Sequence, residues 1–178
     1  MKCWRRLGAI GDTERRKLPL WGPALHRYTI ELTWTGNLGE GTASYRSYSR
    51  DYRINCDDKP PIDGSSDPAF RGDARRWNPE ELLLASIAAC HKLWYLHLCA
   101  DAGICVVDYR DAASAVMKRD DEGVTRIVEA TLSPQVTLAA GQDEAMATML
   151  HERANAECFI ASSVKFPIVH RPTVLQDD

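Results

Sequence analysis

Two cysteines stand out among the residues of this chain that could do chemistry. Cys90 lies midway along an apolar segment, directly after Ala88 and Ala89, which leave room beside its sulfur. Cys158 comes much later, directly after a second segment of helical pattern. A single buried cysteine is usually an inert packing residue, but a thiolate attacks electrophiles such as peroxides. Cys90 is therefore the candidate nucleophile.

Charged residues near Cys90 decide whether its thiol can ionise. Glu80 lies ten positions earlier, nearly three helical turns away and roughly on the same face. A carboxylate alone disfavours the thiolate, so a cation must stand between the two groups. The loop before the helix offers three: Arg71, Arg75 and Arg76. A guanidinium held by Glu80 could stabilise the thiolate and donate hydrogen bonds to a peroxide oxygen.

A metal site at the same place is an alternative, since one cysteine and two histidines can bind zinc. His91 and His97 are near Cys90, but His91 is its direct neighbour on a helix and points away from it. The chain has no CxxC motif, which argues against a zinc ribbon and a thioredoxin-like site. Cys99 and Cys105 flank the helix end at Gly103, where a disulfide is the alternative, but packing is the favoured interpretation for both. We expect no metal and no other cofactor.

A long helix is predicted to carry Cys90. Asn78 is suited to the N-cap and Pro79 to the first helical position, and two acidic residues follow in the first turn. Gly103 is a natural helix end, so the helix spans 78–102. It is apolar almost all round, which predicts burial in a domain centre or an interface. A second helix is predicted over 142–157, with a further short turn from Cys158.

The remaining elements are predicted to be strands, from alternating apolar patterns and β-branched or aromatic residues. They span residues 26–34, 42–54, 104–117, 125–138 and, as a terminal or edge strand, 164–174. The first two form a hairpin across a glycine-rich turn, and an irregular connection follows over 56–77. The order predicts an α+β fold with mainly antiparallel sheet.

Length and charge limit the function classes. The chain has 178 residues, and we expect a loose N-terminal extension over 1–24 and a single domain over 25–178. A net charge of −3 gives no general electrostatic reason to bind nucleic acid or an anionic membrane. The longest strongly apolar stretch, 82–90, is too short to span a bilayer. The basic N-terminus lacks a continuous apolar segment, so no secretory signal is predicted and the expected location is cytoplasmic.

Three segments carry a resemblance to a known family. The segment NPEELLLASIAACH (78–91) resembles the NPEEL…AAC helix of the OsmC/Ohr family of organic hydroperoxide reductases. The segment HERANAECFIASSVKFPI (151–168) is similar to the second-cysteine stretch of that family. The first hairpin, with Trp34 and Gly41-Thr42, also resembles the family's N-terminal strands. The resemblance covers roughly residues 26–174.

The resemblance implies a fold and a set of roles. The fold would have mainly antiparallel sheets packed on two central helices, in an intertwined homodimer with active sites at the interface. Cys90 would be the peroxidatic cysteine, Cys158 the resolving cysteine and Glu80 the anchor of an active-site arginine. The Ohr branch takes this arginine from a Gly-Gly-Arg element in the first hairpin, which is absent here. The OsmC branch takes it from the loop before the helix, where Phe-Arg-Gly places Arg71, so the chain is expected nearer that branch.

The expected activity is reduction of organic hydroperoxides, and of hydrogen peroxide, to alcohols or water. It would proceed through a Cys90 sulfenic acid and a Cys90–Cys158 disulfide, which a dithiol reductant such as a lipoyl protein or a small thiol would reduce. Trp94, Tyr95 and Phe159 are candidates to line a pocket for the organic tail, or ordinary core residues. Phe159 stands where the family commonly has proline, and His91 where an apolar residue is usual. The alternative is a non-catalytic, stress-associated protein that binds small molecules on the same fold.

Overall fold

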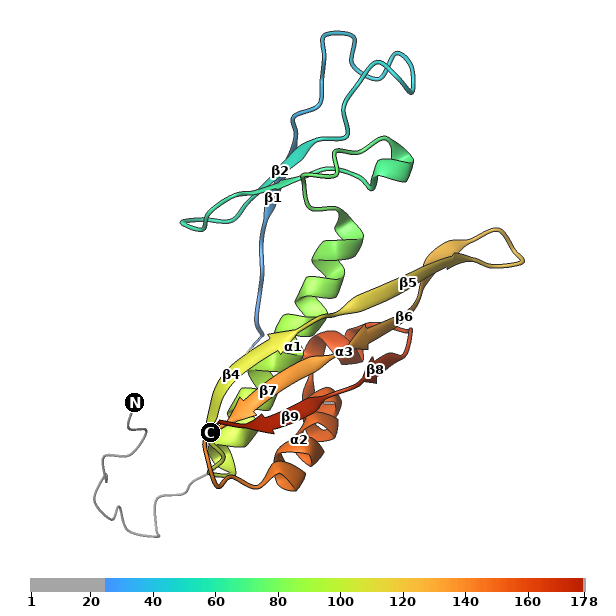
Figure 1. The fold of residues 1–178 in the computed structure, drawn as a ribbon. Helices are drawn as coiled ribbons and strands as arrows, with labels where there is room; N and C mark the ends of the chain where they lie inside the picture. The colour runs from blue at the N-terminus through green and yellow to red at the C-terminus, as the bar shows by residue number, and fades with distance from the viewer. Residues whose placement is uncertain (1–24, 178) are drawn as a thin grey trace.

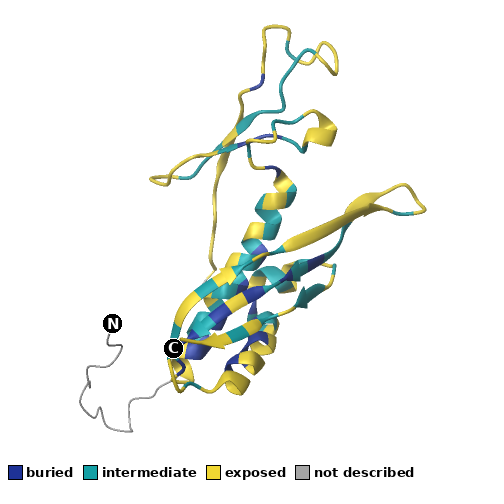
Figure 2. Cartoon of the chain, in the orientation of Figure 1, coloured by how far each residue is buried: buried dark blue, intermediate teal, exposed yellow. Residues whose placement is uncertain are grey.

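The computed structural model describes residues 25–177, so the expected extension over 1–24 lies outside the described residues. The chain forms a small N-terminal part and a larger body, and one long helix joins them (Figure 1). The helices are α1 (Pro79–Asp101), α2 (Glu144–Glu157) and α3 (Phe159–Ser163). In the body, these helices cover one face of the strands, and the buried residues concentrate between the two layers (Figure 2).

The N-terminal part is an antiparallel sheet of three short strands in the order β1-β2-β3. The strands are β1 (Glu31–Trp34), β2 (Tyr52–Asn55) and β3 (Ile62–Gly64). The predicted hairpin pairing is confirmed, but both of its strands are shorter than expected. Most of the segment predicted as strand 42–54 is a loop held by local side-chain bonds. Asn37 Oδ1 accepts from the backbone N–H groups of Gly39 and Gly41, and Arg50 lies 4.2 Å from the ring centres of Tyr45 and Tyr48. Such bonds compete with strand pairing.

The predicted start and end of α1 are confirmed. Asn78 Oδ1 accepts the backbone N–H of Glu81 at 2.8 Å, and the Glu81 carboxylate accepts the backbone N–H of Asn78 at 3.1 Å. This reciprocal capping box fixes the first turn. Gly103, with φ of 75°, follows the last turn in the left-handed conformation that glycine tolerates best. Because Glu81 caps the helix, Glu80 is left for another role.

The predicted burial of α1 on every face does not occur within one chain. Its fully buried residues lie on the side that packs against α2 and the body strands: Ile87, His91, Tyr95, Leu98 and Cys99. On another side, Leu93 is 63% exposed. With 23 residues and a mean hydropathy of 1.4 in its most apolar window, α1 as a whole is long and apolar enough to cross a bilayer, unlike the shorter stretch judged from the sequence. Its packing in the body accounts for one apolar side, and the other lies open.

The predicted strands 104–117 and 125–138 pair as expected, but each is divided in two. The four strands are β4 (Val106–Asp111), β5 (Ser114–Arg119), β6 (Thr125–Leu132) and β7 (Pro134–Leu138). β4 pairs with β7, and β5 pairs with β6. At the division, the backbone N–H of Ser133 donates to Asp111 Oδ1 at 2.8 Å instead of to a neighbouring strand. The long hairpin therefore contributes to two small sheets.

The C-terminal segment completes both sheets in parallel, which corrects the prediction of one edge strand over 164–174. It forms β8 (Ile168–His170), parallel to β6, and β9 (Thr173–Gln176), parallel to β7. The helices α2 and α3 carry the chain back across the sheet between β7 and β8. Such a crossover returns the chain in its original direction, so the new strand pairs in parallel. The α+β class with antiparallel-rich sheets is confirmed.

Candidate functional site

The site is built where the middle of α1 meets the junction of α2 and α3. Cys90 lies on α1, and Cys158 lies between the other two helices. The Cys158 sulfur accepts the backbone N–H of Ala161 at 3.4 Å and so caps α3. The thiols of Cys158 and Cys90 are joined by a hydrogen bond, and neither cysteine is in a disulfide. The structure therefore brings together two cysteines that are far apart in the sequence.

The two thiols differ in access to solvent and in acidity. Cys158 is only 1% exposed, whereas Cys90 is partly exposed and opens into a cavity. Burial, followed by the hydrogen bond to Cys90, raises the pKa of Cys158 to about 11. Cys158 is therefore a protonated thiol at neutral pH, and its S–H can donate to the Cys90 sulfur. Cys90 is the member of the pair that can meet a ligand.

The cavity beside Cys90 has a volume of about 420 Å³. Its walls are largely apolar and include Leu93, Trp94 and Phe159. The rings of Trp94 and Phe159 meet edge to face, with centres 5.5 Å apart, an arrangement that aromatic pairs favour. Two of the three aromatic residues proposed from the sequence as lining residues thus lie in the wall. Tyr95 does not, because it is fully buried in the core.

Arg71 is held in a compact loop of the N-terminal part. It follows the 3₁₀ turn η1 (Pro68–Phe70) with φ of 68°, in the left-handed region that is rare for arginine. Gly72 comes next, and a Cβ on it would lie 1.5 Å from the carbonyl oxygen of Ser66, so only glycine fits. Asp67 accepts the backbone N–H of Ala69 at 2.7 Å and closes the turn. The loop fixes the backbone of Arg71 while the side chain remains exposed.

The loop arginines differ in their partners. Arg75 forms a two-pronged ion pair with Asp73, at 3.0 and 2.9 Å. Arg76 lies within 4 Å of three carboxylates, those of Asp51, Asp63 and Asp73. Within residues 25–177, Arg71 has no ion-pair partner. Arg71 is therefore the loop arginine that is free to serve another group.

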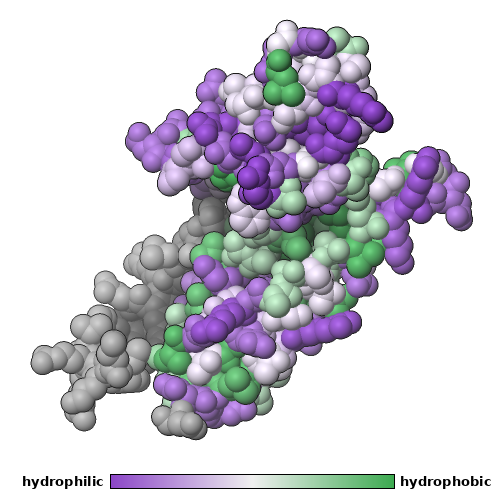
Figure 3. Space-filling view, turned by 45° about the horizontal axis from the view of Figure 1, so that its top comes forward, coloured by the Kyte–Doolittle hydropathy of each residue, from purple (hydrophilic) through white to green (hydrophobic). Residues whose placement is uncertain are grey.

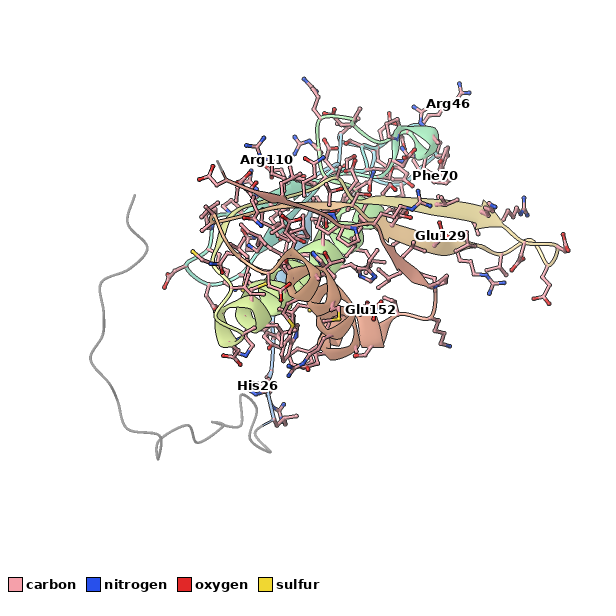
Figure 4. All side chains as sticks on the ribbon, turned by 60° about the horizontal axis from the view of Figure 1, so that its bottom comes forward. His26, Arg46, Phe70, Arg110, Glu129 and Glu152 are labelled. Atoms are coloured by element: carbon pink, nitrogen blue, oxygen red, sulfur yellow. The ribbon has the colours of Figure 1, made fainter. Side chains whose placement is uncertain are left out.

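Glu80 and Arg71 are not next to Cys90 of the same chain. Glu80 lies in the first turn of α1, and its charge, after burial, contributes to raising the pKa of Tyr52 on β2. Cys90 lies ten positions further along the helix, which corresponds to about 15 Å along the axis. Arg71 belongs to the N-terminal part, where Phe70 marks the loop in Figure 4. One chain therefore holds the two thiols in one place, and Arg71 and Glu80 in another.

A buried histidine cluster was missed in the sequence. His91 Nε2 and His151 Nδ1 lie 3.0 Å apart, their rings are within 10° of parallel, and the His170 ring centre is 4.6 Å from that of His91. Tyr95 stacks on His151 with ring centres 3.8 Å apart. Burial, with the neighbouring imidazoles, lowers the pKa of His91 to about 3 and that of His151 to about 4. The rings are thus neutral at pH 7 and tie α1 to α2 and β8.

The histidine cluster is distinct from the alternative metal site of Cys90, His91 and His97. His91 faces α2, whereas His97 lines the Cys90 cavity. Among residues 25–177, no group of three or more His, Cys, Asp or Glu side chains is arranged to hold a metal ion. The only sequence signal for the cluster was the presence of histidines within apolar helical segments, and their meeting depends on the tertiary fold.

The comparisons with known proteins agree with this architecture. The model of the OsmC-like protein family matches residues 72–172 of the chain. No curated protein matches the chain significantly. An OsmC-like protein of unknown function from Vibrio cholerae is similar at 24% identity and a TM-score of 0.77, over 84% of this chain and 100% of that one.

Two further solved structures are named for hydroperoxide resistance. The organic hydroperoxide resistance protein from Elizabethkingia anophelis has 20% identity and a TM-score of 0.60, over 85% of this chain and 99% of its own. One from Legionella pneumophila has 16% identity and a TM-score of 0.62, over 85% and 98%. These likenesses establish the fold. The family match includes Glu80 and both cysteines, begins one residue after Arg71, and spans more than half of the sequence, so the chain belongs to the OsmC-like protein family.

Proposed function

We propose that the protein is a thiol-dependent peroxidase that reduces organic hydroperoxides at Cys90. The observation that carries the proposal is the contact between an accessible thiol, which opens into an apolar cavity, and a buried, protonated thiol. Family membership supports a peroxide-related role, as do two similar structures named for organic hydroperoxide resistance. The apolar cavity suits the organic part of such a substrate.

The first step oxidises Cys90. Its thiolate attacks the distal oxygen of ROOH, an S–O bond forms, and the O–O bond breaks. The leaving alkoxide takes a proton and departs as ROH, while the sulfur becomes a sulfenic acid. An arginine at this point would stabilise the thiolate and donate hydrogen bonds to the peroxide. The peroxide is thereby reduced by two electrons.

The second step uses Cys158. Its thiol attacks the Cys90 sulfenic sulfur, an S–S bond forms, and the hydroxide that leaves combines with the Cys158 proton as water. The raised pKa of Cys158 keeps this thiol protonated until the sulfenic acid is present beside it. A dithiol reductant then reduces the disulfide by two exchange reactions and restores both thiols. We place this cycle in the cytoplasm, where dithiol reductants are maintained.

The activating arginine, in this proposal, comes from a second copy of the chain. Glu80 lies about 15 Å from Cys90 along α1. Arg71 belongs to the N-terminal part, before the start of that helix, and lacks an ion-pair partner within residues 25–177. Two α1 helices packed antiparallel would bring the start of one helix beside the middle of the other.

Exposed apolar surface supports such an assembly. Leu32 and Trp34 on β1 are 57% and 41% exposed, and Leu93 on α1 is also exposed. Apolar surface is visible between the N-terminal part and the body (Figure 3). Apolar patches of this kind typically mark an interaction site. An intertwined homodimer would cover them and would place Arg71 and Glu80 of the partner subunit at Cys90.

The second candidate is a protein that binds an apolar small molecule without catalysis, which the cavity alone would also suit. Titration of free thiols before and after one equivalent of cumene hydroperoxide separates the two. The peroxidase loses two thiols per subunit, and Cys158→Ser instead retains a sulfenic acid that dimedone traps. A wild-type protein that keeps all its thiols under these conditions is a binding protein.

A further inference from the structure

One face of α2 packs against α1 mainly through small side chains. Its buried residues recur at helical spacing and form one stripe: Ala147, His151, Ala154 and, at the end of the helix, Cys158. Leu150, the other buried residue of α2, lies one position off this stripe. The register of two packed helices is set by side chains that interlock with the facing helix. On this stripe, His151 is the one side chain large enough to do so.

His151 contacts two rings of α1 that lie one turn apart. Its Nδ1 atom is 3.0 Å from His91 Nε2, so one ring nitrogen donates to the other. Its face stacks on Tyr95, with ring centres 3.8 Å apart and planes within 11° of parallel. The His170 ring of β8 also packs on His91, with centres 4.6 Å apart. A shift of α2 by one turn, about 5.4 Å, would break both contacts of His151.

The bond between His91 and His151 is the one hydrogen bond that either ring makes among residues 25–177. His91 Nδ1 and His151 Nε2 are buried there without a partner. Breaking the bond would therefore leave all four ring nitrogens unpaired in a buried place, which is unfavourable for polar groups. A buried polar pair of this kind specifies the register of two helices, because a shifted arrangement leaves its members unsatisfied.

The same two helices carry the thiol pair. Cys90 directly precedes His91 on α1. Cys158 lies seven positions after His151, which is two turns further along the same face of α2. A disulfide requires Cα atoms within about 7 Å of each other, so a shift of α2 by one turn would carry Cys158 out of reach of Cys90. The contact of the thiols therefore depends on the register that the histidines set.

We propose that His91 and His151 are positioning residues for the resolving step: their contact fixes the register of α2 on α1 and so holds Cys158 against Cys90. This inference rests on the proposed peroxidase function, because it concerns the second step of that cycle. Both rings are buried within one chain, so a second copy of the chain does not alter their contact. The histidines touch neither the substrate nor the reacting sulfurs.

The test measures how readily the Cys90–Cys158 disulfide forms. Each protein is equilibrated with mixtures of glutathione and glutathione disulfide, quenched with acid and alkylated, and the disulfide is quantified by peptide mass spectrometry. Two exchange reactions pass two electrons from the protein thiols to glutathione disulfide, which leaves as two thiols. The equilibrium constant therefore reports how closely the fold presents one thiol to the other.

Two substitutions of His151 separate the hydrogen bond from ordinary packing. His151→Phe keeps a ring that can stack on Tyr95 but loses the bond, and its equilibrium constant should fall about tenfold, the effect of one lost buried hydrogen bond. His151→Asn loses the ring but places an amide at the position of Nδ1, where it can donate or accept, and should lie nearer to wild type. A role in packing alone would give the reverse order. Val136→Ala removes buried volume from β7 and should match wild type.

The glutathione equilibrium uses no peroxide, so its failure and the failure of the proposed function are distinguishable. Equal constants for wild type and His151→Phe, or a lower constant for His151→Asn than for His151→Phe, overturn the positioning role whatever the activity. A wild type that forms no Cys90–Cys158 disulfide also overturns it. A wild type that consumes no hydroperoxide, but keeps the equilibrium dependent on His151, would overturn the peroxidase function and leave the positioning role standing.

Discussion

The two halves of the candidate site differ in how much of their surroundings one chain supplies. The Cys90–Cys158 pair lies in the body, where α1, α2 and α3 enclose it and the two thiols are already in contact. Arg71 and Glu80 lie in and beside the N-terminal part, and neither has an ion-pair partner within residues 25–177. A redox pair needs only the fold of one chain, whereas the group that activates it can come from another. The following experiments test this division.

The largest effect is expected from the cysteines. Cys90→Ser should abolish hydroperoxide reduction, because no other thiol among residues 25–177 lines the cavity. Cys158→Ser should permit one oxidation and leave a Cys90 sulfenic acid in place of the intramolecular disulfide. Rapid-quench mass spectrometry of each variant after one equivalent of hydroperoxide measures both outcomes. Cys99→Ser is the matched control, since Cys99 is buried in the core. Disulfide formation in Cys158→Ser through another cysteine would show that the resolving residue was wrongly assigned.

The next largest effect is expected from Arg71. Arg71→Ala should slow peroxide reduction by about a hundredfold, the scale of one lost donor of transition-state stabilisation, and should leave fold and dimer intact. Mixing it with Cys90→Ser then tests where the arginine acts. If sites form across two chains, a mixed dimer regains one complete site, and a random mixture recovers about a quarter of wild-type activity. No recovery after verified subunit exchange would place the arginine in the same chain as its cysteine.

Glu80→Ala should have a milder effect than Arg71→Ala, because the arginine would still be present but less well positioned. The peroxidase rate and the pH dependence of Cys90 alkylation measure it. Arg75→Ala and Arg76→Ala are controls, since both arginines are engaged by carboxylates of their own loop region. Loss of activity in Arg76→Ala comparable to that in Arg71→Ala would contradict the choice of arginine.

The smallest effect concerns stability within the body. The pKa values of His91 and His151 are lowered in the folded state, from an ordinary value of 6.5 to about 3 and about 4. The unfolded chain therefore binds more protons below pH 6.5, and stability that is present above this value is lost as the pH falls toward 4. The slope should approach about 1.4 kcal/mol per pH unit for each histidine. Urea unfolding across this range should show it, and His151→Phe should reduce it. An unchanged slope would mean that the cluster does not exclude protons.

The sequence specified much of the fold because its strongest signals are local. Asn78, Pro79 and Gly103 fix the ends of α1 through bonds to their own neighbourhood, so these ends could be predicted without the rest of the molecule. The hairpin pairings followed from alternation and turns. The division of the long hairpin at Ser133 and the loop around Arg50 could not be predicted in this way, because they depend on individual side-chain bonds.

The candidate site was predictable only in part. Cys90 was identified by its place on the helix, and Cys158 and Arg71 acquired roles through resemblance; the role of Arg71 stays a prediction. The sequence by itself determined the residue types and the limits of the long helix. Only the tertiary structure decided that the two thiols touch, that His91 meets His151, and that β8 and β9 pair in parallel. These contacts join segments far apart in the chain, and their register is set by packing rather than by local pattern.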